Sequence, residues 1–161
     1  MEPVIRPYHE SDSLDVIRLS LSAWAPVFAS ERDVMGDDIF ERLYGNDWRR
    51  KQQLDVEKVL ADDKMNVWVA EVNGEVVGFV AAVLKIDSGT GEVYMLAVDP
   101  EVQNNGLGTQ LTDVATDWIR AAGVSLALVS TGGDVGHAPA RRTYEKAGYT
   151  PVPSVNYFKA L

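Results

Sequence analysis

The sequence contains no cysteine, and this absence excludes several kinds of chemistry. A chain without cysteine has no disulfide bonds, no thiolate metal ligands and no cysteine nucleophile. Histidine is nearly as scarce, because the 161 residues include only His9 and His137, which lie far apart in the sequence. Since the carboxylates show no calcium-loop spacing either, we predict that the protein binds no metal.

The sequence also has few basic residues and no long apolar run. Lysine and arginine together number 15 against 24 acidic residues, and the net charge of -9 argues against nucleic-acid binding. No apolar run approaches the length of a membrane span, and residues 1–10 lack the apolar core of a signal peptide. We therefore expect a cytoplasmic protein that binds neither nucleic acid nor a membrane.

Length and patterning predict a single domain over residues 1–161, because the chain is long enough to bury one core and contains no repeat or linker. Strands are expected at residues 4–7, 66–72, 76–86, 92–98 and 125–130, with one or two more between 149 and 159. Helices are expected from about Leu14, once or twice between residues 37 and 63, from Leu107 to Ala122, and at about 139–146.

Local signals add detail to these elements. Ser11 or Ser13 is the expected cap of the first helix, and Pro26 is expected to break or kink it. Asn73-Gly74 predicts a tight hairpin turn. The residues expected to point inward between positions 37 and 63 are Ile39, Leu43, Leu54, Val59 and Leu60.

The rest of the chain is organised around residues 92–122, which predict a buried strand, a glycine turn and an amphipathic helix. Asp99-Pro100 ends the strand, and Gly123 ends the helix. A glycine turn at a helix N-terminus suits an anion, because the first N–H groups of the helix lack partners and the helix dipole adds positive potential. We expect this site to bind a phosphate or pyrophosphate, although glycine turns before helices also occur where they only allow close packing.

Two motifs give this arrangement a family resemblance. Gln103-x-x-Gly106-x-Gly108, after a strand ending in Leu96-Ala97-Val98, resembles the acetyl-CoA motif of the GNAT N-acetyltransferase superfamily. Residues 137–149, HAPARRTYEKAGY, resemble the next block of that family. The resemblance implies an α/β (α+β) domain with a mixed, mostly antiparallel sheet, a splay between its two parallel strands, and helices on both faces. It also implies an acetyl-CoA-dependent N-acetyltransferase.

Two residues are the expected catalytic groups. Tyr144 matches the tyrosine with which the family commonly protonates the leaving thiolate, and a phenol with a pKa of roughly 10 still carries its proton at neutral pH. Glu92, at the start of the central strand, matches a glutamate that some members use as general base. The alternative interpretations are a core tyrosine and an ion-paired glutamate at a strand end.

By the same resemblance, the cofactor lies along the end of the central strand and the glycine turn. The Leu96 N–H would face the acetyl oxygen, and Val98 would pair with the pantetheine arm. The expected cofactor-binding residues are Leu96, Ala97, Val98, Gln103, Asn104, Asn105, Gly106, Leu107, Gly108, Thr109 and His137.

The sequence departs from the family pattern at two places. Asn104-Asn105 replaces residues that are often cationic in relatives, so Arg141 and Arg142 are alternative phosphate ligands. His137 stands where the family more often has asparagine, and a histidine can also donate a hydrogen bond there.

The acceptor is the least determined partner. We expect a primary amine of a small molecule or peptide, with Trp24 and Phe28 on one helical face as candidate contacts, or as core residues. An acidic entrance at Asp37 and Asp38 would favour a cationic amine.

An exposed edge strand is compatible with a homodimer. A non-catalytic acyl-CoA-binding module and an acyltransferase with a different acyl donor are the alternative functions.

Overall fold

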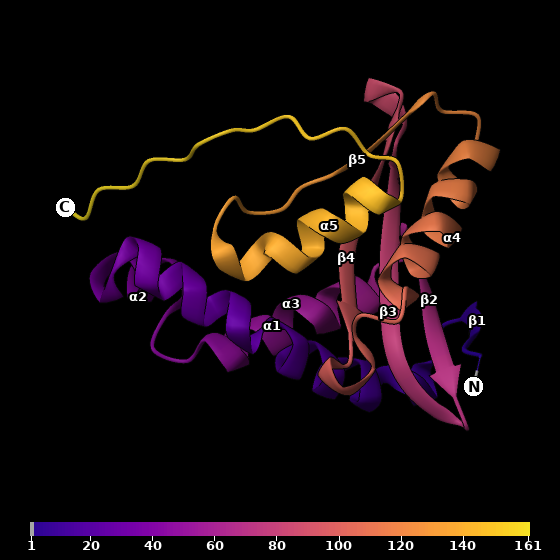
Figure 1. Cartoon of the computed structure of the whole chain (residues 1–161), viewed down its shortest axis with the longest axis horizontal. Coiled ribbons are helices and arrows are strands. Elements are labelled where there is room, and N and C mark those ends of the chain that lie inside the picture. Colours follow the sequence, from indigo (N-terminus) through magenta and orange to yellow (C-terminus); the bar gives the residue numbers. More distant parts are fainter. Residues whose placement is uncertain (1) are drawn as a thin grey trace.

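The computed structural model describes residues 2–161 (Figure 1). Its strands are β1 (Val4–Pro7), β2 (Met65–Val72), β3 (Glu75–Lys85), β4 (Thr90–Val98) and β5 (Leu126–Val129). Its α-helices are α1 (Ser13–Met35), α2 (Asp37–Tyr44), α3 (Trp48–Ala61), α4 (Leu107–Ala121) and α5 (Ala138–Lys146). Four short 3-10 turns join them, η1 (Glu10–Asp12), η2 (Ile86–Ser88), η3 (Pro100–Val102) and η4 (Val135–His137).

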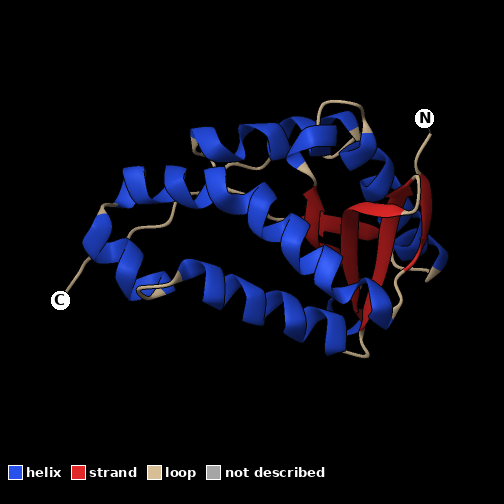
Figure 2. Cartoon of the chain, turned by 90° about the horizontal axis from the view of Figure 1, so that it is seen from below, coloured by secondary structure: helices blue, strands red, loops and turns tan. Residues whose placement is uncertain are grey.

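The five strands form one sheet in the order β1-β2-β3-β4-β5. The first three pairings are antiparallel, and β5 runs parallel to β4. The predicted hairpin joins β2 to β3, and its turn residues Asn73 and Gly74 both have positive φ, at 55° and 84°. The strands occupy one end of the molecule, and the helices extend beyond them (Figure 2). The mixed, mostly antiparallel sheet is therefore confirmed.

Helices cover both faces of the sheet, as predicted. On one face, α4 buries Leu111 and Ile119 against the strands. On the other face, Val16 and Leu19 of α1 and Val56 of α3 pack against the sheet. Each face therefore has its own hydrophobic core, and the sheet is held in register between them.

The first helix is not broken at Pro26, because α1 continues through the proline to Met35. Proline removes one helical hydrogen bond, but buried residues lie on both sides of it, with Leu19 at 0% and Phe28 at 9% exposure. This packing outweighs the local preference. Asp12 is the N-cap residue and makes no side-chain cap bond, so neither Ser11 nor Ser13 has the predicted capping role.

Both helices predicted between residues 37 and 63 are present, but their inward faces are only partly as expected. Val59 is buried at 5% exposure, whereas Leu43 and Leu54 are 36% and 39% exposed. Phe40 and Val56 take the central positions instead, at 1% and 0% exposure. The ring of Phe40 packs edge-on against Phe28 of α1, and the Arg32 guanidinium lies over it.

The closing strands predicted between residues 149 and 159 are wrong. Residues 149–161 form neither helix nor strand, and Figure 1 shows this segment running past α5, away from β5 and toward α2. Pro151 and Pro153 have no backbone N–H to donate to a neighbouring strand. None of the helices within residues 2–161 is long and apolar enough to cross a membrane.

Candidate active site

The site begins where β4 leaves β5. The two strands pair from Thr90 with Leu126 to Val93 with Val129, and no further. At the same point the pairing with β3 shifts register, which leaves Tyr94 as a bulge residue. The second half of β4, including Leu96, Ala97 and Val98, therefore has a strand neighbour on one side only. This is the predicted splay, and it leaves backbone groups of these three residues without a strand partner on the β5 side.

The loop at residues 103–106 follows directly. Asn104 has a left-handed φ of 66°, and Gly106 has a φ of 80° and caps α4. A Cβ added at Gly106 would meet no atom within 4 Å, so the space over the start of α4 is open. The first N–H groups of α4, from Leu107 to Thr109, have no acceptor within the helix. The loop and the helix thus present backbone donors to an open surface that suits an anion.

Side-chain amides hold this loop in shape. The Gln103 amide donates to the carbonyl oxygen of Val98 at 2.9 Å, and the Asn105 amide donates to that of Val102 at 3.3 Å. Asp99 accepts a hydrogen bond from the Glu101 N–H at 3.0 Å and fixes the preceding turn. Gln103 and Asn105 are among the predicted cofactor contacts, and in this structure their side-chain amides hydrogen-bond to backbone carbonyls of the loop region.

The helix that carries Tyr144 lies against the start of α4. A Cβ added at Gly108 would stand 3.2 Å from Cγ2 of Thr143, so a larger residue there would require Thr143 to shift by a few tenths of an ångström. The ring of Tyr144 packs edge-on to Tyr149, with centroids 6.4 Å apart. The hydroxyl of Tyr144 makes no hydrogen bond with any described residue, whereas that of Tyr149 bonds Thr116 at 2.7 Å. Burial, with a smaller contribution from Tyr149, raises the pKa of Tyr144 to about 12.

Glu92 lies in the half of β4 that β5 still pairs, opposite Leu128. Its carboxylate forms an ion pair with Lys85, and its side chain is 14% exposed. Within residues 2–161 the carboxylate of Glu92 and the hydroxyl of Tyr144 make no direct contact with each other. The structure therefore places the two predicted catalytic groups on different elements, Glu92 before the splay and Tyr144 beside the anion loop.

A partly buried polar network lies at the loop before α5, and the sequence did not predict it. Asp134 accepts hydrogen bonds from Ser30 of α1 and from the ring of His137. The Nε2 atom of His137 lies 3.9 Å from a carboxylate oxygen of Glu31. Both ring nitrogens of His137 thus face carboxylates of this chain, and a bond to the cofactor would require the ring to turn. No local pattern links Ser30 to a residue 104 positions away.

The arginines proposed as alternative phosphate ligands differ in availability. The Arg141 guanidinium donates to the carbonyl oxygens of Gly132 and Asp134, each at 2.7 Å. Arg142 is exposed on the same helix. Arg141 therefore stabilises the loop before α5, and Arg142 is the one of the two whose charge is available to a ligand.

The predicted acceptor contacts lie largely in the core. The ring of Phe28 stacks on Trp48 with centroids 4.5 Å apart and packs edge-on against Phe40. Trp24 is partly buried and lies edge-on to Phe79 at 6.3 Å. Phe28 therefore stabilises the junction of α1, α2 and α3. Trp24 is the more exposed of the two side chains.

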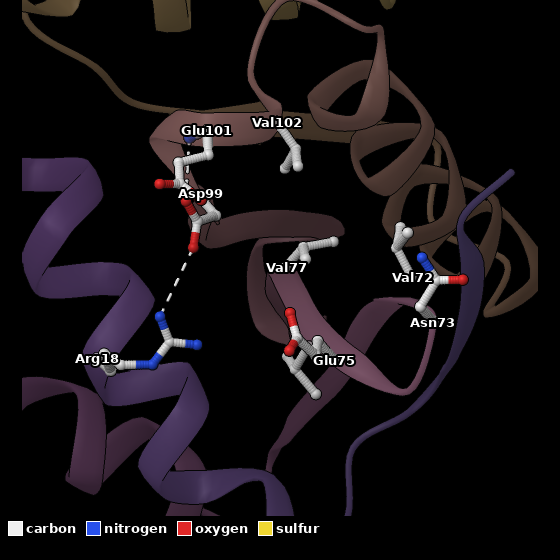
Figure 3. Close-up of a pocket in the computed structure, with 9 residues that line it drawn as sticks. Arg18, Val72, Asn73, Glu75, Val77, Asp99, Glu101 and Val102 are labelled. Atoms are coloured by element: carbon white, nitrogen blue, oxygen red, sulfur yellow. Dashed lines mark hydrogen bonds and ion pairs between the residues drawn. The ribbon is translucent and has the colours of Figure 1, made fainter. Parts of the chain in front are cut away.

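One cavity has none of the predicted site residues in its wall. It has a volume of about 350 Å³ and opens between α1, the β2–β3 hairpin and η3 (Figure 3). Across it, Arg18 lies 3.7 Å from Asp99 (Figure 3). Its wall residues are Arg18, Val72, Asn73, Glu75, Val76, Val77, Asp99, Glu101 and Val102. The cavity adjoins the base of the anion loop without including the loop itself.

Over the described residues, no three histidine or acidic side chains gather in a position to hold a metal ion.

Comparison with known proteins agrees with this geometry. The mycothiol acetyltransferase of Beutenbergia cavernae is 41% identical over 91 residues, which are 56% of this chain and 30% of that protein. The chain thus spans less than a third of that relative. An aminoglycoside N-acetyltransferase, AAC(6′)-Iy, in complex with a CoA-linked bisubstrate analog, shares the fold at a TM-score of 0.69 and 15% identity, covering 100% of this chain and 99% of that one.

A ribosomal-protein-alanine N-acetyltransferase from Brucella melitensis has the same fold at a TM-score of 0.67 and 18% identity, covering 99% of this chain and 100% of the other. Beyond these individual likenesses, residues 34–149 match the profile of the Acetyltransferase (GNAT) family, and this stretch includes the splay, the anion loop and Tyr144. The chain belongs to the GNAT acetyltransferase family.

Proposed function

We propose that this protein is an acetyl-CoA-dependent N-acetyltransferase that moves an acetyl group to a primary amine by direct attack in a ternary complex. The observation that carries the proposal is the contact of Gly108 with Thr143. It brings α5, the helix that carries Tyr144, against the first turn of α4. We infer that the anion-binding helix end and the phenol of Tyr144 belong to one site.

The donor would be held mainly by backbone groups. The N–H groups of residues 106–109 suit the pyrophosphate of acetyl-CoA, since glycine lets the phosphate oxygens come close to the chain. No cation lies within the loop itself, because Asn104 and Asn105 occupy the positions that are often cationic in relatives. Arg142, exposed on the neighbouring α5, is our candidate for the missing positive charge.

The chemistry follows from the side chains available. The amine nitrogen attacks the acetyl carbon, the C–N bond forms, and the C–S bond breaks to release the CoA thiolate. The Leu96 N–H would stabilise the oxygen anion that develops. Tyr144 gives its proton to the thiolate, and the proton lost by the amine passes to Glu92, directly or through water. With no cysteine in the chain, no cysteine-linked acyl intermediate forms in this scheme.

The fold does not identify the acceptor. The similar proteins are named for mycothiol, for aminoglycosides and for a ribosomal-protein alanine, and these are three different acceptor classes. Ion pairs weaken the case for an acidic entrance at Asp37 and Asp38. Asp37 lies 3.7 Å from Arg32, and Asp38 pairs with Arg42 at 3.0 Å, so arginines partly neutralise both carboxylates. We therefore propose a small-molecule or peptide amine without assigning its charge.

The first experiment is calorimetric titration with acetyl-CoA of the intact protein and of Gly106→Glu. That variant places a negative side chain into the open space over α4, so binding should be lost. Gly89→Glu is the matched control, because Gly89 also has a positive φ, at 66°, and also has open space around it, but lies in the turn before β4. Binding lost equally in both variants, or absent in the intact protein, would overturn the donor site.

The second experiment is a panel of amines assayed by thiol release. Because the chain has no cysteine, a thiol reagent reports only the released CoA. Turnover with any primary amine would support acetyl transfer. Tight acetyl-CoA binding without turnover across the panel, with the same behaviour in Tyr144→Phe, would favour the alternative of a non-catalytic acyl-CoA-binding module.

A further inference from the structure

The cavity between α1, the β2–β3 hairpin and η3 has a wall of two kinds, one apolar and one charged (Figure 3). Its volume of about 350 Å³ lies within the range of about 300–1,000 Å³ that is usual for small-molecule sites. Val76 and Val77 of β3 are buried at 4% and 8% exposure, and Val72 and Val102 line the cavity with them. A ligand in this cavity would therefore find apolar surface for its body.

Charged groups make up the other part of the wall. Three acidic residues line the cavity, namely Glu75, Asp99 and Glu101. Arg18 supplies one positive charge, so two negative charges are in excess among the described wall residues. Arg18 is also shared, because it lies 3.7 Å from Asp99 and 3.6 Å from Asp15, which is not part of the wall. Figure 3 draws no bond to the carboxylate of Glu75 or of Glu101, so both lack a counter-ion within the wall.

These two parts of the wall fit one kind of ligand. A bare metal ion needs several oxygen ligands around it, and no three acidic side chains of the described chain gather in that way. An anion would meet the two unpaired carboxylates. A cation with an apolar body can instead place its head at Glu75 and Glu101 and its body on the valines. The carboxylates then gain charge-assisted hydrogen bonds.

The cavity shares residues with the turn that leads into the anion loop. The Asp99 N–H donates to the carbonyl oxygen of Val77 at 2.8 Å, and the Asp99 carboxylate accepts from the Glu101 N–H at 3.0 Å. The carbonyl oxygen of Val102 accepts from the Asn105 amide at 3.3 Å. A ligand that holds these wall residues in place therefore also holds the anion loop.

We propose that this cavity binds a small monovalent organic cation with an apolar body, and that the bound cation strengthens the binding of acetyl-CoA. The cation would fix the turn from Asp99 to Val102, and a loop that is already ordered binds its ligand at a lower entropic cost. It would also add positive charge beside a loop that has no cation of its own. The effect on acetyl-CoA rests on the proposed function, because it assumes the donor site at the anion loop.

The first test is calorimetric titration with butylguanidinium, which has one delocalised charge and a butyl body. A guanidinium stays protonated at neutral pH, so this probe is not an acceptor for acetyl transfer. Butylurea is the matched probe, because it has nearly the same shape without the charge. We expect saturable binding of butylguanidinium, with a Kd for butylurea that is higher by roughly tenfold or more. No saturable binding of butylguanidinium, or equal Kd values for the two probes, would overturn the proposal.

The second test locates the site. Glu75→Gln combined with Glu101→Gln removes both unpaired charges and keeps the side-chain shapes, so the Kd for butylguanidinium should rise roughly tenfold or more. Asp33→Asn combined with Glu41→Gln is the matched control, since both residues are exposed and the net charge changes by the same amount. Asp33 lies about 22 Å further along α1 than Arg18, and Glu41 lies on α2. Equal rises in the two double variants would mean that net charge alone attracts the probe, and the proposed site would be wrong.

The third measurement tests the link to the donor site. With the cavity saturated by butylguanidinium, the Kd for acetyl-CoA should fall roughly fivefold, and saturating acetyl-CoA should lower the Kd for butylguanidinium by the same factor. A Kd for acetyl-CoA that stays the same or rises would contradict the link. If the intact protein does not bind acetyl-CoA, the donor site of the proposed function fails, whereas the first two tests still decide whether the cavity binds the cation.

Discussion

Ser30 of α1 and Asp134 of the loop before α5 are joined by a side-chain hydrogen bond across 104 residues of sequence. The Gly136 N–H donates to both side chains, at 2.9 Å to Ser30 and 3.2 Å to Asp134. Ser30 is 8% exposed, so this contact is largely shielded from water. It fixes α1 to the loop from which α5 and Tyr144 follow. The position of Tyr144 therefore depends on a polar network and not only on apolar packing.

Replacing Asp134 by asparagine tests this network. Burial alone would raise the pKa of Asp134, but hydrogen bonds from Ser30 and His137 outweigh burial and hold the pKa below its usual value. A lowered pKa means that the carboxylate contributes stability above the unfolded pKa of about 4, and that this contribution is lost as the pH falls through the folded pKa. Asp134→Asn should lower the free energy of unfolding at pH 7 by about 1–3 kcal/mol and weaken the loss of stability in acid.

Urea titrations at pH 7 and at successively lower pH measure both effects. Ser30→Ala removes one of the same hydrogen bonds from the other side and should move both quantities in the same direction. An Asp134→Asn protein with the acid dependence of the intact protein would contradict the assignment.

The hydroxyl of Tyr144 gives the most direct test of catalysis. Because it makes no hydrogen bond within the described chain, Tyr144→Phe should leave the free energy of unfolding and the Kd for acetyl-CoA nearly unchanged. The loss of a proton donor should lower kcat by roughly 10²- to 10⁴-fold. Steady-state kinetics, calorimetry and urea titration separate the three quantities.

Tyr149→Phe is the matched control for that experiment. It removes the hydrogen bond to Thr116 and should cost about 1 kcal/mol of stability while kcat is retained. Equal losses of kcat in the two variants would mean that Tyr144 acts through packing.

Much of the fold was predictable because its signals are local. Asn73-Gly74 specified a turn in which both residues have positive φ, and few other residue pairs accept that geometry. The glycines at 106 and 108 marked the start of α4, one by its left-handed conformation and the other by its close approach to Thr143. In these places, backbone geometry alone restricts the residue type.

The parts that failed depend on contacts between distant residues. Pro26 predicted a break or a kink, and the break is absent because the apolar contacts of α1 on both sides of the proline outweigh its local cost. The burial of Phe40 in place of Leu43 is decided by the aromatic cluster around Phe28, which joins three helices. Motifs mark the anion loop and Tyr144 as candidate site residues, whereas no spacing in the sequence connects Ser30 with Asp134, so their hydrogen bond could not be predicted.

Glu92 can be tested against its ion-paired alternative. If it is the general base, Glu92→Gln should lower kcat by roughly 10²-fold or more. Lys85→Met, the control, removes the other half of the ion pair. Since Lys85 is half exposed, we expect it to change stability by no more than about 1 kcal/mol. If both variants reduce kcat to the same small extent, Glu92 is an ion-paired residue at the start of its strand and not the general base.

Gly91 tests how closely α4 must pack on β4. A Cβ added there would stand 2.7 Å from Cγ1 of Ile119, a side chain that is 2% exposed and belongs to the core. Gly91→Ala should therefore lower the free energy of unfolding by roughly 1–3 kcal/mol, because Ile119 or the whole helix must move. Urea titration measures this cost, and Gly133→Ala, which would meet no atom within 4 Å, is the control.

The same variant should also affect the anion loop. Because α4 begins at that loop, a helix pushed off β4 would displace the N–H groups of residues 106–109, and acetyl-CoA would bind more weakly. If instead only Ile119 changes its rotamer, stability falls while the Kd for acetyl-CoA stays the same. The two outcomes distinguish a core that adjusts locally from one that holds the donor site in place.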